Sequence, residues 1–158
     1  MEKDEGNYQV VANNRKASFN YFFLELIESG IVLLGSEVKS LRLGKGNISE
    51  SYAVDSGGEL FLQNSYIPEY SQSSYNNHDP RRRRKLLLSK KQINKIIGKI
   101  NQEGLTVVPV RMYFKHKGIA KVQIAIAKGK KQHDKRHTKK TREDRKSTRL
   151  NSSHLVIS

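Results

Sequence analysis

The 158-residue sequence contains no cysteine. That absence excludes a disulfide scaffold, a thiolate zinc site, a catalytic thiol and a cysteine-ligated iron–sulfur cluster. No apolar run reaches the roughly 18 residues that a membrane-spanning helix needs. The polar, acidic start of the chain also lacks the apolar stretch of a secretory signal. Apolar residues make up only 35% of the chain. We therefore expect a cytoplasmic protein, part of whose chain stays outside the core.

Acidic residues are scarce relative to basic ones, with 15 Asp+Glu against 30 Lys+Arg and a net charge of +15. Residues 1–80 are net acidic, whereas residues 81–99 contain nine basic residues and no acidic one. A second basic block begins at Lys128. Such asymmetry indicates an anionic partner rather than a particular fold. Because the basic segments lack the apolar face of a membrane-surface helix, nucleic acid is favoured over lipid.

Short apolar runs between polar or glycine-containing breaks predict a mainly β protein. The expected strands are residues 8–12, 19–26, 31–34, 48–54, 59–64, 105–114 and 119–127. We expect the second and third of these to form a hairpin about the turn Glu28–Gly30. The fourth and fifth should form another about Asp55–Gly58, whose glycines permit positive φ.

Two helices are predicted from their capping residues. Ser36 is a good N-cap for a helix over residues 37–43, with a carboxylate in its first turn. Ser89 and Gln92 match a capping box, and isoleucines at helical spacing follow them. Together these elements predict an OB-like antiparallel β-barrel with appended short helices and a basic, largely disordered C-terminal tail. The outer face of such a barrel often binds nucleic acid.

The composition divides the chain into four parts. We expect residues 1–6 to be disordered, residues 7–128 to form the barrel and residues 129–146 to be the basic tail. Residues 147–158, rich in serine and asparagine, form an atypical terminus, and foreign sequence fused to a truncated gene is the favoured hypothesis for it. The sequence shows no heptad repeat or exposed apolar stripe that would indicate self-association. We therefore expect a monomer.

The five histidines carry no recognisable catalytic motif. His133 and His137 are four residues apart and could share a helical face, as the ligands of a metal-assisted nuclease would. However, the adjacent glutamate of a zincin motif is absent, and so are a Walker loop and a dinucleotide fingerprint. We therefore expect no cofactor, no metal and no enzymatic activity.

Five motifs together resemble the SmpB family, the SsrA (tmRNA)-binding proteins of bacteria. They stand in the family's order and spacing: Asn14–Ala17, Glu28–Ile31, Gly35–Lys45, Asp79–Leu88 and Ala127–Arg136. The resemblance implies an OB-like barrel that binds tightly to the tRNA-like domain of tmRNA. It also implies trans-translation, in which the complex occupies the empty A site of a stalled 70S ribosome.

The same resemblance implies which residues contact RNA. For tmRNA they are Asn14, Arg15, Lys16, Glu28, Glu37, Lys39, Ser40, Arg42, Lys45, Arg84, Lys85 and Leu87. For the decoding centre of the ribosome they are Lys128, Lys130, Lys131, His133, Lys135 and Arg136. A carboxylate such as that of Glu28 can accept a hydrogen bond from a base amino group, which adds specificity that lysines lack. The residues alone leave open that Glu28 serves only the hairpin and that Leu87 belongs to the core.

The chain departs from the family after Arg136. Asp144 stands where the family's helical tail has a tryptophan, and this chain has no tryptophan. We expect tmRNA binding to survive this departure and tagging on the ribosome to be the step affected. The alternative interpretation is a general OB-type RNA-binding or ribosomal protein. It predicts no preference for a folded tRNA-like domain over bulk RNA.

Overall fold

The computed structural model describes residues 8–71, 77–102 and 104–131. The predicted disorder of residues 1–6, most of the predicted basic tail and the atypical terminus over residues 147–158 lie outside these ranges. So do His133, Lys135, Arg136 and His137. None of the described helices is long and apolar enough to cross a membrane.

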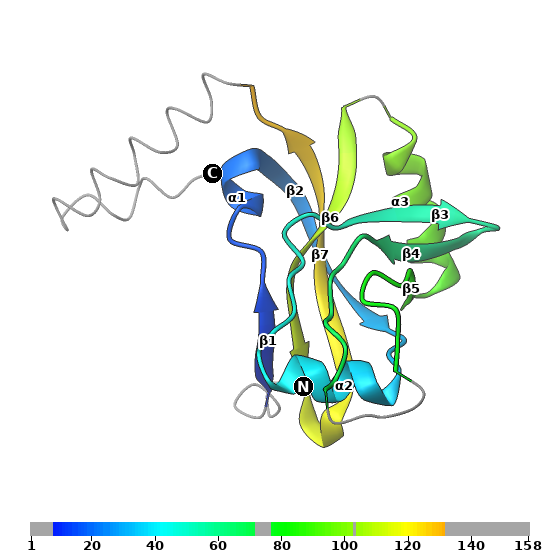
Figure 1. Ribbon diagram of the computed structural model, residues 1–158. Coiled ribbons are helices and arrows are strands. Elements are labelled where there is room, and N and C mark those ends of the chain that lie inside the picture. Colours follow the sequence, from blue (N-terminus) through cyan, green and yellow to red (C-terminus); the bar gives the residue numbers. More distant parts are fainter. Residues whose placement is uncertain (1–7, 72–76, 103, 132–158) are drawn as a thin grey trace, which may run out of the picture.

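Seven strands form one curled antiparallel sheet (Figure 1), in the order β1-β6-β7-β2-β5-β4-β3. Among the described residues no ladder joins the edge strands β1 and β3, so the OB-like barrel is open. The strands are β1 (Gln9–Asn13), β2 (Tyr21–Ile31), β3 (Tyr52–Ser56), β4 (Glu59–Gln63), β5 (Arg84–Leu87), β6 (Leu105–Phe114) and β7 (Ala120–Gly129). The prediction of a mainly β, antiparallel fold is confirmed.

Helices close the sheet around its core. Helix α2 (Gly35–Arg42) crosses one end of the sheet (Figure 1) and contributes Leu41 to the main apolar cluster. Helix α3 (Lys90–Ile100) contributes Ile93 and Ile96 to the same cluster. The short helix α1 (Ala17–Asn20) lies with Ala17 in a smaller cluster beside Ala125 and Ala127 of β7. The sheet therefore has one face turned to the main core, and α1 packs against part of its outer face.

Several predicted elements are confirmed. The hairpin of β3 and β4 turns at Gly57 and Gly58, whose φ values of 62° and 81° meet the requirement of a type I′ turn. Strand β6 has the predicted bounds, and the strand predicted over residues 119–127 is β7, which pairs with β6. Residues 48–51 instead form a turn closed by the Ser51 amide on the Ile48 carbonyl at 3.2 Å, so β3 begins only at Tyr52.

The predicted hairpin about Glu28–Gly30 is wrong, because β2 runs unbroken from Tyr21 to Ile31 and pairs with β7 along most of its length. Gly30 does not have the positive φ of a turn glycine. It lies opposite Leu87 of β5, where a Cβ atom would come 3.1 Å from the Leu87 Cβ. Gly30 therefore permits close packing of two strands rather than a reversal of the chain.

Ser36 is not the N-cap that was predicted for α2. The helix begins at Gly35 with Leu34 as the N-cap residue, and the Glu37 carboxylate accepts from the Leu34 amide at 2.8 Å. Half of a capping box is thus provided by Glu37, while the Ser36 hydroxyl bonds elsewhere. The structure also contains α1 and β5, neither of which was predicted.

The cap of α3 is confirmed, since the Ser89 Oγ accepts from the Gln92 amide at 3.2 Å. We expect Ser89→Ala to lower the free energy of unfolding by about 1 kcal/mol, because one amide of the first turn loses its acceptor. Urea denaturation measures this loss. Ser89→Asp keeps an acceptor and should retain wild-type stability; an equal loss in both variants would contradict a capping role.

Candidate nucleic-acid interface

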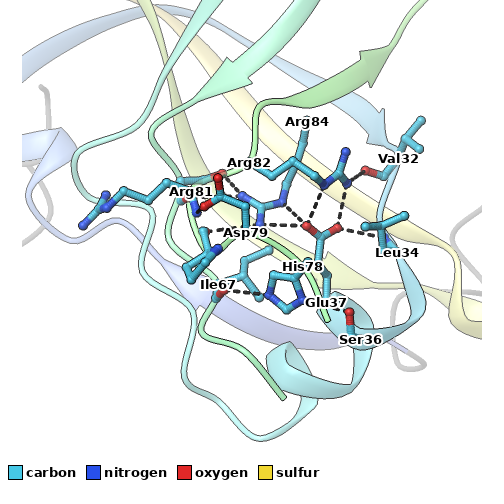
Figure 2. A network of polar contacts seen from close by, with 12 residues as sticks. Val32, Leu34, Ser36, Glu37, Ile67, His78, Asp79, Arg81, Arg82 and Arg84 are labelled. Carbon is cyan, nitrogen blue, oxygen red and sulfur yellow. Dashed lines mark hydrogen bonds and ion pairs between the residues drawn. The ribbon is translucent and has the colours of Figure 1, made fainter. Parts of the chain in front are cut away.

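The basic run Arg81–Lys85 leads into β5 and forms its first two residues, and its side chains alternate as in an extended chain. Arg82 and Arg84 turn inward, and both reach the carboxylate of Glu37 on α2 (Figure 2). Arg82 donates through Nε at 2.9 Å and Nη2 at 2.7 Å, a two-pronged contact. Arg84 donates through Nε at 2.9 Å. The side chains of Glu37 and Arg84 are both 0% exposed.

Every part of the Arg84 guanidinium is occupied within this network. Nη1 donates to the Ser65 carbonyl at 3.0 Å and to the Ser65 hydroxyl at 2.9 Å, and Nη2 donates to the Pro80 carbonyl at 3.3 Å. The network therefore ties α2 and β5 to the chain between them. Burial works against the charged form of Glu37, but hydrogen bonds from Arg82, the Leu34 amide and Arg84 outweigh it, so its pKa lies below the ordinary value.

Three residues predicted to contact tmRNA thus have almost no exposed surface. Glu37 and Arg84 form the buried ion pair, and Ser40 is also buried. Their burial fits a role in holding α2 and β5 together rather than a direct contact with RNA. A buried charge needs partners that replace its water, and here Glu37 and Arg84 provide them for each other.

His78 secures the adjoining segment. Its Nε2 lies 2.8 Å from the Ile67 carbonyl, and its Nδ1 lies 2.8 Å from the Ser36 hydroxyl. Because a carbonyl only accepts, Nε2 must carry the proton in this contact. The ring therefore links the first turn of α2 to the segment that leads into the arginine run, as Figure 2 shows.

Glu28 lies on the outer face in the middle of β2, opposite Gln123 of β7, with its side chain 40% exposed. Its Oε1 accepts from the Tyr113 hydroxyl at 2.7 Å, and its Oε2 accepts from Lys115 Nζ at 3.1 Å. Lys121 Nζ stands 4.0 Å from the same Oε2. Partial burial opposes the charge of Glu28, but these hydrogen bonds and cations outweigh it, so its pKa is lowered.

The carboxylate of Glu28 is therefore held in one orientation and kept ionised. A carboxylate offers about four lone-pair sites, and the three partners leave room for further donors on its exposed side. Burial, followed by the bond to Glu28, raises the pKa of Tyr113, so this phenol stays a hydrogen-bond donor. The site can accept from an amino group without first being assembled.

Leu87 does not belong to the core, since it is 50% exposed. It pairs with Gly30 across the β2–β5 ladder and projects on the same outer face as Glu28. The structure thus brings together two predicted residues that are 59 positions apart in the chain. Tyr113, Lys115 and Lys121 join them and were not predicted, because only the register of β2, β6 and β7 places them beside Glu28.

Asn14 is buried at the end of β1, where β6 has a bulge after Pro109. The Asn14 amide nitrogen of the backbone donates to the Val110 carbonyl at 2.8 Å, and its side-chain Nδ2 donates to the Pro109 carbonyl at 2.8 Å. Asn14 therefore holds the end of β1 against β6 at its bulge. Pro109 has no N–H to donate there, and its carbonyl accepts from Asn14 instead. The neighbouring Arg15 and Lys16 are exposed and lead into α1.

The basic residues of α2 remain on the surface. The Lys39 ammonium lies 5.7 Å from the centroid of the Tyr70 ring. The Arg42 guanidinium lies 4.4 Å from the centroid of Phe114 and donates to Gln9 at 2.8 Å. Lys45 is exposed just beyond the helix. These cations lie toward the end of the sheet that α2 covers.

The residues predicted to meet the decoding centre are described only in part. Lys128 and Lys131 are exposed at the end of β7. Lys130 is only 8% exposed, and its ammonium donates to the Ser18 carbonyl at 3.1 Å above the Phe22 ring. Lys130 therefore anchors the start of the tail against α1. Across residues 8–71, 77–102 and 104–131, no group of three or more histidine, cysteine or acidic residues could hold a metal ion.

Known proteins are similar to this chain in sequence. Residues 11–153 match the family described as SmpB protein. The chain is 56% identical over 147 residues to the SsrA-binding protein of Rhizobium johnstonii (strain DSM 114642 / LMG 32736 / 3841), covering 92% of this chain and 97% of that protein. It is 56% identical over 143 residues to the SsrA-binding protein of Sinorhizobium fredii (strain NBRC 101917 / NGR234), covering 90% of each.

Among solved structures, one described as "tmRNA-SmpB: a journey to the center of the bacterial ribosome" has a TM-score of 0.66 to this fold at 47% identity. The superposition covers 80% of this chain and 92% of that chain. The sequence matches, the shared fold and the five motifs agree, and the chain belongs to the SmpB family.

Proposed function

We propose that this chain binds the tRNA-like domain of tmRNA and delivers it to stalled ribosomes for trans-translation. It acts as a cytoplasmic RNA-binding protein and not as an enzyme. The observation that carries the proposal is the outer face of β2 and β5, where an ionised Glu28 and an exposed Leu87 lie together beside lysines. The SsrA-binding relatives and the tmRNA–SmpB structure support the same assignment.

The chemistry of this face suits a folded RNA. Lys115 and Lys121 offer charge to phosphates, which gives affinity without sequence preference. The Glu28 carboxylate instead repels phosphate and can accept a hydrogen bond from the amino group of a base. An exposed leucine can pack on an unstacked base. Phosphate contact and base recognition are therefore carried out by different side chains, the former by the lysines and the latter by Glu28 and Leu87.

The proposal is tested by competition. Purified full-length chain should bind a tmRNA tRNA-like domain in preference to an equal mass of bulk RNA. Glu28→Ala should weaken that binding by roughly 10- to 100-fold, the range expected for losing a hydrogen bond to a charged group. The same variant should bind bulk RNA at least as well as the wild type, because it gains one unit of positive charge. Filter binding or fluorescence anisotropy measures both affinities.

Glu25→Ala is the matched control. Glu25 lies on the same strand, is similarly exposed and pairs with one lysine, Lys95, at 2.7 Å. This control should leave the preference for the tRNA-like domain unchanged. If the wild type shows no preference over bulk RNA, the chain is a general RNA-binding protein and the proposal is refuted.

A further inference from the structure

Two arginines of the basic run take no part in the buried network. Arg81 and Arg83 are exposed, while Arg82 and Arg84 between and after them turn inward. Figure 2 shows Arg81 extending away from Glu37. The alternation continues into β5, where Lys85 and Leu87 face outward and Leu86 is buried. A run of five cations is thus two functional sets rather than one.

Each outward arginine lies against an aromatic ring. The Arg81 guanidinium is 5.1 Å from the centroid of Tyr66, and the Arg83 guanidinium is 4.5 Å from the centroid of Phe61. Arg81 also donates to the Asn64 side chain at 2.9 Å. These contacts hold long, flexible side chains in place before any ligand arrives, which reduces the entropy lost on binding.

In each pair the guanidinium covers one face of the ring. What faces solvent is the remaining set of N–H donors, a geometry that matches phosphate oxygens. Among the described residues no carboxylate forms an ion pair with Arg81 or Arg83. Lys85 has one such neighbour, Glu59, at 3.8 Å, and both of those side chains are well exposed.

The position of these cations indicates which ligand they would bind. Lys85 pairs with Phe61 in the β4–β5 ladder, and Leu87 follows two residues later on the same strand face, opposite Gly30 of β2. Arg81, Arg83 and Lys85, which we call the arginine strip, therefore continue the outer face on which Glu28 and Leu87 lie. One RNA seated on Glu28 and Leu87 would meet the arginine strip next.

We propose that the arginine strip binds the phosphate backbone of tmRNA beyond the part contacted by Glu28 and Leu87. This inference rests on the proposed function and adds a second contact to the same RNA. Phosphate contacts of this kind supply affinity and fix the register of the RNA, while sequence is read elsewhere. The strip consists of the outward-facing cations of the basic run. It does not include Arg82 and Arg84, which bind Glu37.

The test is the salt dependence of binding to a tmRNA tRNA-like domain. Each phosphate contact contributes about 0.7 to 0.9 to the slope of log K against log salt. The double variant Arg81→Gln/Arg83→Gln should therefore flatten the slope by about 1.5. At about 0.1 M salt its affinity should fall by roughly 10-fold or more, and the loss should shrink toward none near 1 M.

Lys90→Gln/Lys91→Gln is the matched control. It removes the same charge from two exposed positions in the first turn of α3, which take no part in the β4–β5 and β2–β5 ladders. It should leave the slope nearly unchanged. Phe61→Leu keeps both arginines but removes one ring, and should weaken binding only a few-fold without changing the slope. Circular dichroism of each variant confirms that the fold is intact.

The outcomes separate this inference from the proposed function. If the wild type fails to prefer the tRNA-like domain over bulk RNA, the proposed function fails whatever the strip does. If the wild type shows the preference but the arginine variant behaves like the lysine control, the inference about the strip is overturned. It is equally overturned if the arginine variant binds tmRNA normally and loses affinity only for ribosomes.

Discussion

Replacing Glu37 with alanine is expected to lower the free energy of unfolding by about 3–5 kcal/mol, the cost of removing one partner of a buried ion pair. Arg84 would keep its charge in a site with no exposed surface, because an arginine does not lose its proton. Its remaining partners are carbonyls and a hydroxyl, which do not neutralise it. A loss of this size is a large fraction of the stability of a typical domain.

Urea denaturation followed by circular dichroism measures the effect. Glu59→Ala is the control, since it removes a carboxylate from an exposed pair with Lys85 and should cost about 1 kcal/mol or less. Glu37→Leu/Arg84→Met removes both buried charges and should be less destabilised than Glu37→Ala. Equal losses for Glu37→Ala and Glu59→Ala would mean that the buried network contributes little.

Acid should remove the same stabilisation without any mutation. The pKa of Glu37 is lowered by folding, so the unfolded chain binds a proton at a pH where the native protein does not. The stabilisation is therefore fully present above the unfolded pKa, near the ordinary value of 4.5. It is lost as pH falls from there through the lower folded pKa.

Comparison with Glu37→Gln isolates this contribution from other carboxylates such as Glu28, whose pKa is also lowered. The wild type should exceed the variant in unfolding free energy by a constant few kcal/mol at neutral pH. That difference should narrow below about pH 4.5, because protonated Glu37 resembles glutamine. Urea midpoints measured from pH 7 to pH 3 give the curve, and a difference that stays constant to pH 3 would contradict the assignment.

Local signals predicted the elements whose ends are set by nearby residues. The cap of α3 lies within four residues of its helix start, and the glycines at 57 and 58 need only their own backbone conformation. The apolar, β-branched-rich runs at residues 105–114 and 119–127 likewise predicted β6 and β7. In each case the deciding interaction is short in sequence, so a pattern suffices.

Interactions between distant segments decided what the sequence could not predict. Glu28–Gly30 has the composition of a turn, but β7, almost a hundred residues later, provides a partner that keeps β2 extended. Five consecutive cations look solvated, but the last two, Arg84 and Lys85, begin β5, and pairing with β2 and β4 gives that strand an inner side. The burial of Arg84 and Glu37 follows from that pairing, as does the exposure of Arg81 and Arg83. The family motif named whole segments and did not distinguish their buried residues from their exposed ones.

The unbroken course of β2 has a consequence for the proposed binding of RNA. Glu28 sits in a central strand whose amides are bonded along the ladder to β7, and such amides exchange with solvent only when the whole sheet opens. The carboxylate therefore cannot leave its place by a local fluctuation, as it could at the tip of a hairpin. Recognition then needs no ordering step on the protein side, and hydrogen exchange in β2 should be as slow in the free chain as global unfolding allows. The rate of RNA association should then depend on diffusional encounter, on the orientation of the two molecules and on the charge around the site.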